Sequence, residues 1–233
     1  MTRAEYAYVQ ARLQARHGGM PGPASWTAPE ASHTAAHYLA RARAGALSAW
    51  VDAQDPSGDA HRVEQQLRLR WRRYVDDLAA WQPPRWRAAT RWFASLPDLA
   101  LIKPPADDAG VARWLQAWLD LMPAGEALGV RLAVLLRRVA TLLMPGLAAA
   151  DGPRHHRTAA HSAQFARSAQ AEPVRRALQR LFRRHAATPV AVFAHLALVA
   201  LDVERLRGGL VVRTLFEPAQ APQRVPLGAS QGA

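Results

Sequence analysis

Six large apolar side chains between residues 59 and 81 recur at the spacing of an α-helix, and this pattern restricts the fold more than any other feature of the chain. The six are Val63, Leu67, Trp71, Tyr74, Leu78 and Trp81, at steps of four, four, three, four and three residues. A helix with this spacing carries all six on one face, which must be buried against another element. Because Ser57 or Asp59 can cap its start and Pro83 and Pro84 follow its end, we predict one long helix here.

Similar patterns recur along most of the chain, whereas the β-branched and aromatic runs typical of strands are nearly absent. We therefore predict an all-α fold, a multi-helix array of roughly nine to eleven helices. The further helices are expected near residues 3–17, 29–43, 47–51, 84–96, 111–122, 125–144, 173–185 and 189–207. The helix at 125–144 is apolar nearly all round and is expected to be the central one, while 146–170 is read as a loop or a weak helix.

The segment from Pro97 to Gly110 contains three prolines and three aspartates, which favours a hinge. We place a boundary there, between an N-terminal helical lobe of residues 1–103 and a C-terminal helical lobe of residues 104–217. The two are either similar lobes or parts of one domain. Residues 218–233 are expected to form a disordered tail.

The composition excludes several classes of chemistry. Without cysteine the chain has no disulfide, no thiolate zinc site and no cysteine nucleophile. It also lacks the glycine-rich loop of nucleotide hydrolases and the Gly-x-Ser-x-Gly turn of serine hydrolases. We therefore predict a protein that is not an enzyme and needs no cofactor. The longest uncharged stretch, 186–201, is shorter than the roughly 20 residues that span a bilayer, so any membrane contact is expected to be peripheral.

A formal net charge of +12 favours acidic partners, which are nucleic acid, anionic lipid or an acidic protein surface. The densest basic cluster lies on the helix expected to begin at Pro173. Its members are Arg175, Arg176, Arg180, Arg183 and Arg184. On a helical wheel they lie opposite an apolar stripe that includes Leu178 and Phe182. We interpret them as a docking face for an acidic partner; the alternative is a solvated face.

Histidines and tryptophans give weaker signals. The candidate metal ligands are His33, His37, His155, His156 and His161, the first two at i, i+4 spacing. A zinc site would also need a third ligand and a carboxylate that orients the rings, for which we consider Asp151 near His155. The favoured interpretation is that these are surface or partly buried histidines of a basic protein. Trp71, Trp81, Trp114 and Trp118 occupy apolar stripe positions and are expected in the core.

Two segments near opposite ends resemble one protein family. The first is Tyr6-Ala-Tyr8-Val-Gln-Ala-Arg12-Leu, and the second is an apolar run from Pro189 that leads into Glu204-Arg-Leu-Arg207-Gly. Together they resemble the opening and closing helices of the C/d-type adapter family of V-type rotary ATPases. Glu204 and Arg207, three residues apart, are expected to pair across one exposed turn.

The resemblance implies a non-catalytic adapter that links the central stalk to the membrane rotor ring and supports ion transport coupled to ATP hydrolysis or synthesis. It implies a peripheral position at the cytoplasmic face of the membrane, with the other components of the ATPase as partners. The chain is shorter than typical members, which fold as three helical lobes. Two other functions fit the residues: a basic helical nucleic-acid-binding protein, and an accessory protein of another membrane complex.

Overall fold

The computed structural model describes residues 3–55, 59–101, 108–123, 130–143 and 156–216, and this part of the chain is built of helices without any strand. The α-helices are α1 (Arg3–Gly18), α2 (Ala24–Glu30), α3 (Ala35–Arg43), α4 (Ser48–Val51), α5 (Ala60–Trp81), α6 (Pro84–Trp92), α7 (Asp108–Asp120), α8 (Val130–Leu143), α9 (His156–Arg184) and α10 (Pro189–Phe216). A 3-10 helix, η1 (Phe93–Leu101), follows α6. The predicted all-α array is therefore confirmed.

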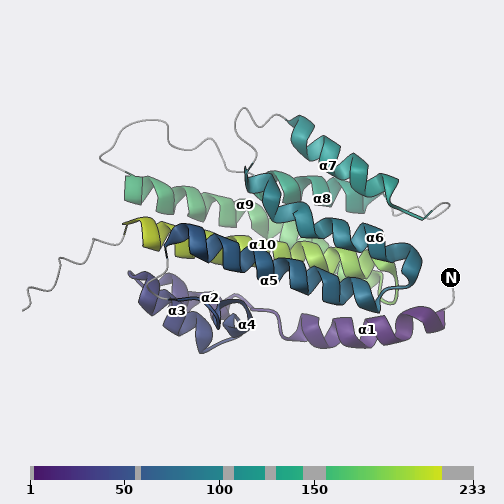
Figure 1. The fold of residues 1–233 in the computed structure, drawn as a ribbon, viewed down its shortest axis with the longest axis horizontal. Coiled ribbons are helices and arrows are strands. Elements are labelled where there is room, and N and C mark those ends of the chain that lie inside the picture. The colour runs from purple at the N-terminus through teal and green to yellow at the C-terminus, as the bar shows by residue number, and fades with distance from the viewer. Residues whose placement is uncertain (1–2, 56–58, 102–107, 124–129, 144–155, 217–233) are drawn as a thin grey trace, which may run out of the picture.

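Helix α10 runs through the middle of the molecule, with α5 and α9 alongside it (Figure 1). Every residue from Ala191 to Val203 is buried. This corrects the expectation that the 125–144 helix is central, because α8 has an exposed side that includes Val134, whose exposed fraction is 47%. Within the described residues, no helix is both long enough and apolar enough to cross a membrane.

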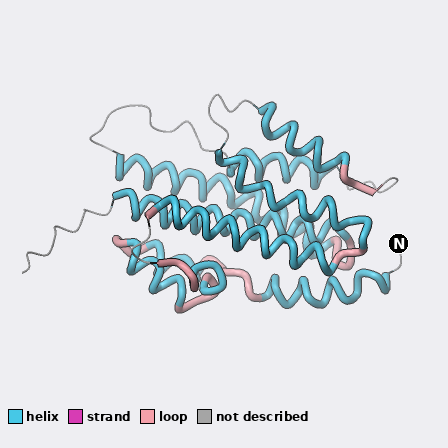
Figure 2. Tube along the Cα trace, in the orientation of Figure 1, coloured by secondary structure: helices cyan, strands magenta, loops and turns pink. Residues whose placement is uncertain are grey.

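The other helices form layers on either side of α10. Figure 2 shows α1 and the short helices α2–α4 along one side, and α7 with α8 on the opposite side. The larger hydrophobic cluster includes residues from Tyr6 to Val203, and so joins both predicted lobes. A smaller cluster joins α2–α4 and the start of α5 to Leu206 and Leu210 of α10. The predicted boundary at 103/104 and the tail 218–233 lie outside the described residues.

The centre of the larger cluster is aromatic. Phe193 of α10 packs against Trp118, Phe93 and Trp86, with ring centroids 5.1, 5.5 and 6.0 Å away. Trp71, Trp114 and Trp118 are buried as predicted, and so are Trp26 and Trp86.

Trp81 was also expected in the core, but unlike Trp71, Trp114 and Trp118 it is only partly buried. The guanidinium groups of Arg12 and Arg16 lie over its ring, 4.7 and 4.6 Å from the centroid. Cations stacked on the ring therefore shield its outer face.

Of the helix boundaries that differ from the prediction, two have a local reason. Pro29 lies inside α2 and does not open the following helix, because the Thr34 hydroxyl accepts a hydrogen bond from His37 N–H (3.2 Å) and caps a new start at Ala35. Helix α9 begins at His156 and continues through Pro173. Pro173 is exposed, so the carbonyl group that loses its intrahelical partner can bond to water.

Candidate partner-binding groove

The C-terminal half of α9 has the two faces that the sequence predicts. Val174, Leu178, Leu181 and Phe182 are buried against the core. Arg176, Arg180, Arg183 and Arg184 are exposed. Because the apolar side chains hold the helix in place, the charged face can make contacts without disturbing the fold.

A groove of about 490 Å³ lies between α8 and α9. Its lining residues are Arg131, Val134, Leu135 and Arg138 from α8, with Ala177, Arg180, Leu181 and Arg184 from α9. On each helix the four positions follow the i, i+3, i+4, i+7 pattern, which places them on one face over two turns. The α8–α9 groove therefore combines apolar side chains with four guanidinium groups over a length of about 10 Å.

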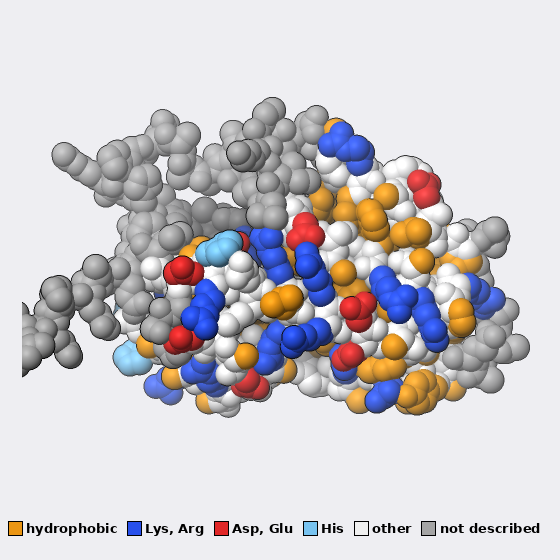
Figure 3. Space-filling model, in the orientation of Figure 1, with side chains coloured by type: hydrophobic (Ala, Val, Ile, Leu, Met, Phe, Trp, Pro, Cys, Tyr) orange, Lys and Arg blue, Asp and Glu red, His pale blue; other side chains and the backbone are white. Residues whose placement is uncertain are grey.

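These four arginines differ from most of those on the opposite face of the molecule. Figure 3 shows basic side chains of that face interleaved with acidic ones. Arg72 lies 3.6 Å from Asp98, and Arg91 lies 3.7 Å from Asp76. In contrast, the four arginines of the α8–α9 groove form no ion pair within the described residues.

Unpaired guanidinium groups at an apolar surface attract anions, because each can form two parallel charge-assisted hydrogen bonds with a carboxylate or phosphate. The groove is therefore suited to an acidic, partly apolar ligand surface. Its α9 arginines belong to the predicted docking face. Arg131 and Arg138 were not predicted, because in sequence they only interrupt an apolar helix.

Arg175, although predicted as part of the docking face, turns inward. Its guanidinium donates to Asp202 Oδ1 of α10 at 2.6 Å, and both side chains are largely buried. On a helical wheel Arg175 lies beside Phe182 at the edge of the apolar stripe, but the wheel does not reveal its partner, because Asp202 lies 27 residues further along the chain. Arg175 thus fixes α9 to α10, a role that differs from the predicted partner binding.

Glu204 and Arg207 pair as predicted, but the pair is not exposed. Arg207 donates to both Glu204 oxygens at 2.7 Å, and also to Glu64 of α5 at 2.6 Å. The exposed fractions of the Glu204 and Arg207 side chains are only 18% and 20%. The two carboxylates raise the pKa of Arg207 despite its burial. These residues link α10 to α5 and lie apart from the groove.

Tyr6, Tyr8 and Arg12, from the first of the two segments that carry the family resemblance, occupy two different environments. Tyr6 is buried and its hydroxyl donates to Gln82 Oε1 at 2.9 Å. Tyr8 is exposed, and Arg12 donates to its oxygen at 2.6 Å. Tyr6 therefore packs α1 onto the end of α5, while Tyr8 and Arg12 remain on the surface.

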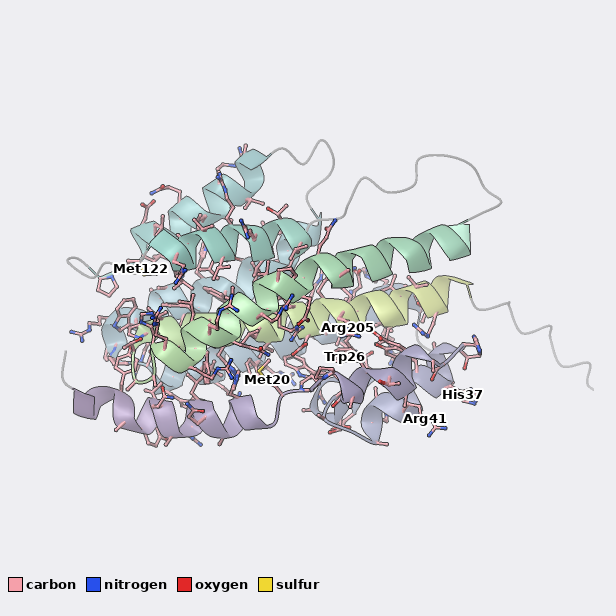
Figure 4. The ribbon with its side chains drawn as sticks, turned by 180° about the vertical axis from the view of Figure 1, so that it is seen from behind. Met20, Trp26, His37, Arg41, Met122 and Arg205 are labelled. Carbon is pink, nitrogen blue, oxygen red and sulfur yellow. The ribbon has the colours of Figure 1, made fainter. Side chains whose placement is uncertain are left out.

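The histidines do not assemble into a metal site in the described part of the chain. His33 and His37 are exposed, and Figure 4 shows His37 on the outer side of α3. His155 lies outside the described residues, and for His156 and His161 only the helical backbone is described. No group of three His, Asp or Glu side chains converges among the residues whose side chains are described.

Fold and groove together define an all-helical protein with a basic surface groove. Comparison of the chain with protein-family models, with curated proteins and with solved structures gave no match.

Proposed function

We propose that this chain is a non-catalytic helical adapter whose α8–α9 groove binds an acidic segment of a partner protein. The observation that carries the proposal is the set of four arginines that line the groove without an ion pair in the described residues. Complementary charge guides encounter and fixes the register of such a contact.

The preferred partner is an amphipathic helix with acidic residues at its edges. A helix laid in a groove anchors through residues at i, i+3, i+4 and i+7, the same spacing that α8 and α9 present. Val134, with its exposed fraction of 47%, and Leu135 supply apolar contact for the centre of that helix. Arg138, Arg180 and their neighbours supply partners for carboxylates at its edges.

The assembly we propose is a rotary ATPase similar to the V-type, or a related membrane complex, in which the adapter links stalk and rotor ring and supports ion transport. This part rests on the resemblance of the two end segments. The helices that contain them, α1 and α10, are in contact, and His17 Nδ1 lies 3.3 Å from His195 Nδ1. The adapter would then lie peripherally at the cytoplasmic face of the membrane.

Affinity purification from membranes of the native host tests the proposal with two charge-matched double variants. Arg138→Glu with Arg184→Glu places two acids in the groove. Arg137→Glu with Arg183→Glu makes the same charge change one residue away on each helix, outside the groove. All four positions are exposed, so circular dichroism should match the parent for both.

The groove variant should lose its partner proteins at about 0.15 M salt, with affinity reduced about tenfold or more, while the control retains them. Equal loss from both variants would show a broad basic face in place of a groove. Two results would overturn the adapter proposal: recovery of no membrane-complex component by the parent chain, or recovery of nucleic acid alone with steeply salt-dependent binding.

A further inference from the structure

A second hollow, of about 440 Å³, lies between the C-terminal end of α1, the α4 region, α5 and α10. Its most buried polar group is Asp202, whose side chain is only 3% exposed. Oδ1 of Asp202 accepts from Arg175, whereas the buried Oδ2 has no hydrogen-bond partner among the described residues. Buried carboxylate oxygens are normally hydrogen-bonded, so this atom favours a ligand that brings an N–H or O–H donor.

The mouth of this hollow is basic. Arg70, Arg73, Tyr74 and Asp77 lie on one face of α5, at i, i+3, i+4 and i+7. Arg16 neutralises Asp77 through a 3.0 Å ion pair, but Arg70 and Arg73 form no ion pair within the described residues. Two guanidinium groups are thus free to hold a phosphate group, which they recognise through paired hydrogen bonds.

Two aromatic side chains and a methionine also line the second hollow. The rings of Trp50 and Tyr74 have centroids 5.4 Å apart and planes inclined by 46°. Met20 also lines the hollow, and Figure 4 shows it between the end of α1 and the body of the bundle. These side chains form a surface on which the aromatic ring of a ligand can pack, since every nucleic-acid base has a flat face that can stack.

We propose that this hollow binds a nucleoside monophosphate whose base carries an amino group. The base packs against Trp50, its amino group donates to Oδ2 of Asp202, and its phosphate lies at Arg70 and Arg73. The volume falls within the range of about 300–1,000 Å³ that small-molecule sites occupy. This binding site goes beyond the adapter function and uses a surface separate from the α8–α9 groove.

Isothermal titration calorimetry of the full chain with AMP, GMP and CMP tests the inference directly. At least one of the three should bind with Kd below about 1 mM, and the matching nucleoside without phosphate should bind about tenfold more weakly. Inorganic phosphate alone should also bind more weakly, because it reaches neither Asp202 nor Trp50. Absence of binding by all three nucleotides would overturn the proposal, as would equal binding of nucleoside and nucleotide.

Two variants locate the ligand. Arg73→Ala should weaken binding about tenfold, whereas Arg72→Ala, one residue away and outside the hollow, should leave it unchanged. Asp202→Asn keeps an oxygen for Arg175 but replaces Oδ2 with an N–H₂ group. It should weaken AMP and leave purine riboside monophosphate, which lacks the amino group, unaffected. Equal effects of Arg73→Ala and Arg72→Ala would refute this placement.

The groove variant Arg138→Glu with Arg184→Glu separates the two proposals, because its substitutions lie on α8 and α9, outside this hollow. It should bind the nucleotide as tightly as the parent while losing the partner protein. Nucleotide binding without a partner would leave this inference standing and remove the adapter function. Loss of nucleotide binding in this variant would contradict the assignment of the ligand to the second hollow.

Discussion

Acidification should change the stability of this protein through two buried groups that act in opposite directions. Burial, with smaller contributions from His17 and Arg16, lowers the pKa of His195 to about 3. Its Nε2 lies 2.6 Å from the Tyr74 hydroxyl and its Nδ1 3.3 Å from Nδ1 of His17, contacts that suit a neutral ring. Burial raises the pKa of Asp202 to about 6, with Arg175 opposing the shift.

The direction of each effect follows from which state binds the proton. Unfolded His195 takes up a proton near pH 6.5, whereas the folded state excludes it, so stability falls as the pH drops. Asp202 is protonated near pH 6 when folded and near 3.8 when unfolded, so stability rises as the pH drops. Between pH 7 and pH 5 the free energy of unfolding should fall by about 2 kcal/mol through His195 and rise by about 1 kcal/mol through Asp202.

Urea unfolding tests these two contributions. For the parent and for each variant, the free energy of unfolding is measured at pH 7 and at pH 5, and the change between the two pH values is compared. Between pH 7 and pH 5, Asp202→Asn should lose about 1 kcal/mol more than the parent, because the His195 effect is no longer offset. His195→Gln should lose about 2 kcal/mol less than the parent over the same interval. If all three proteins change equally, neither buried group controls the pH dependence and the assignment fails.

Two substitutions test the packing around α10. Leu198→Asp should prevent folding, since it places a charge at a fully buried position. Leu69→Asp, at a position 51% exposed, should leave the thermal midpoint nearly unchanged. An unaltered midpoint for Leu198→Asp would show that α10 is not a core helix. At Gly209 an added Cβ would lie 2.6 Å from the Tyr38 hydroxyl and 2.8 Å from ring carbon Cζ, so Gly209→Ala should cost about 1–3 kcal/mol by chemical denaturation. Gly45→Ala meets no atom within 4 Å and should cost far less, and similar costs at both glycines would contradict the close approach of α10 to α3.

Features that depend on local sequence could be predicted. The Asp59 side chain accepts from Arg62 N–H at 2.7 Å and caps α5 as expected, because capping needs only residues within one turn. The apolar and basic faces of α9 likewise follow from helical spacing alone. The burial of Leu198 also follows, from the long uncharged run around it.

Features that depend on which helices are neighbours could not be predicted. The α8–α9 groove exists because Arg131 and Arg138 face Arg180 across a contact that no local pattern encodes. On a helical wheel Arg175 lies at the edge of the apolar stripe and Arg176 on the far side, but the wheel does not show that Arg175 reaches a buried acid on α10. The prediction also placed the 125–144 helix at the centre, whereas the packing of the surrounding helices gives that position to α10.

The central position of α10 has a consequence for how the protein is made. This helix packs against α1, α3, α5, α8, α9 and η1, all of which leave the ribosome before it. Until residues 189–216 are synthesised, the apolar faces of those earlier helices have no common surface to cover them. Contacts such as Arg213 to the Ser32 carbonyl, 181 residues apart, can close only at that stage. Nascent chains should therefore remain dependent on chaperones until α10 emerges and then fold in one late step.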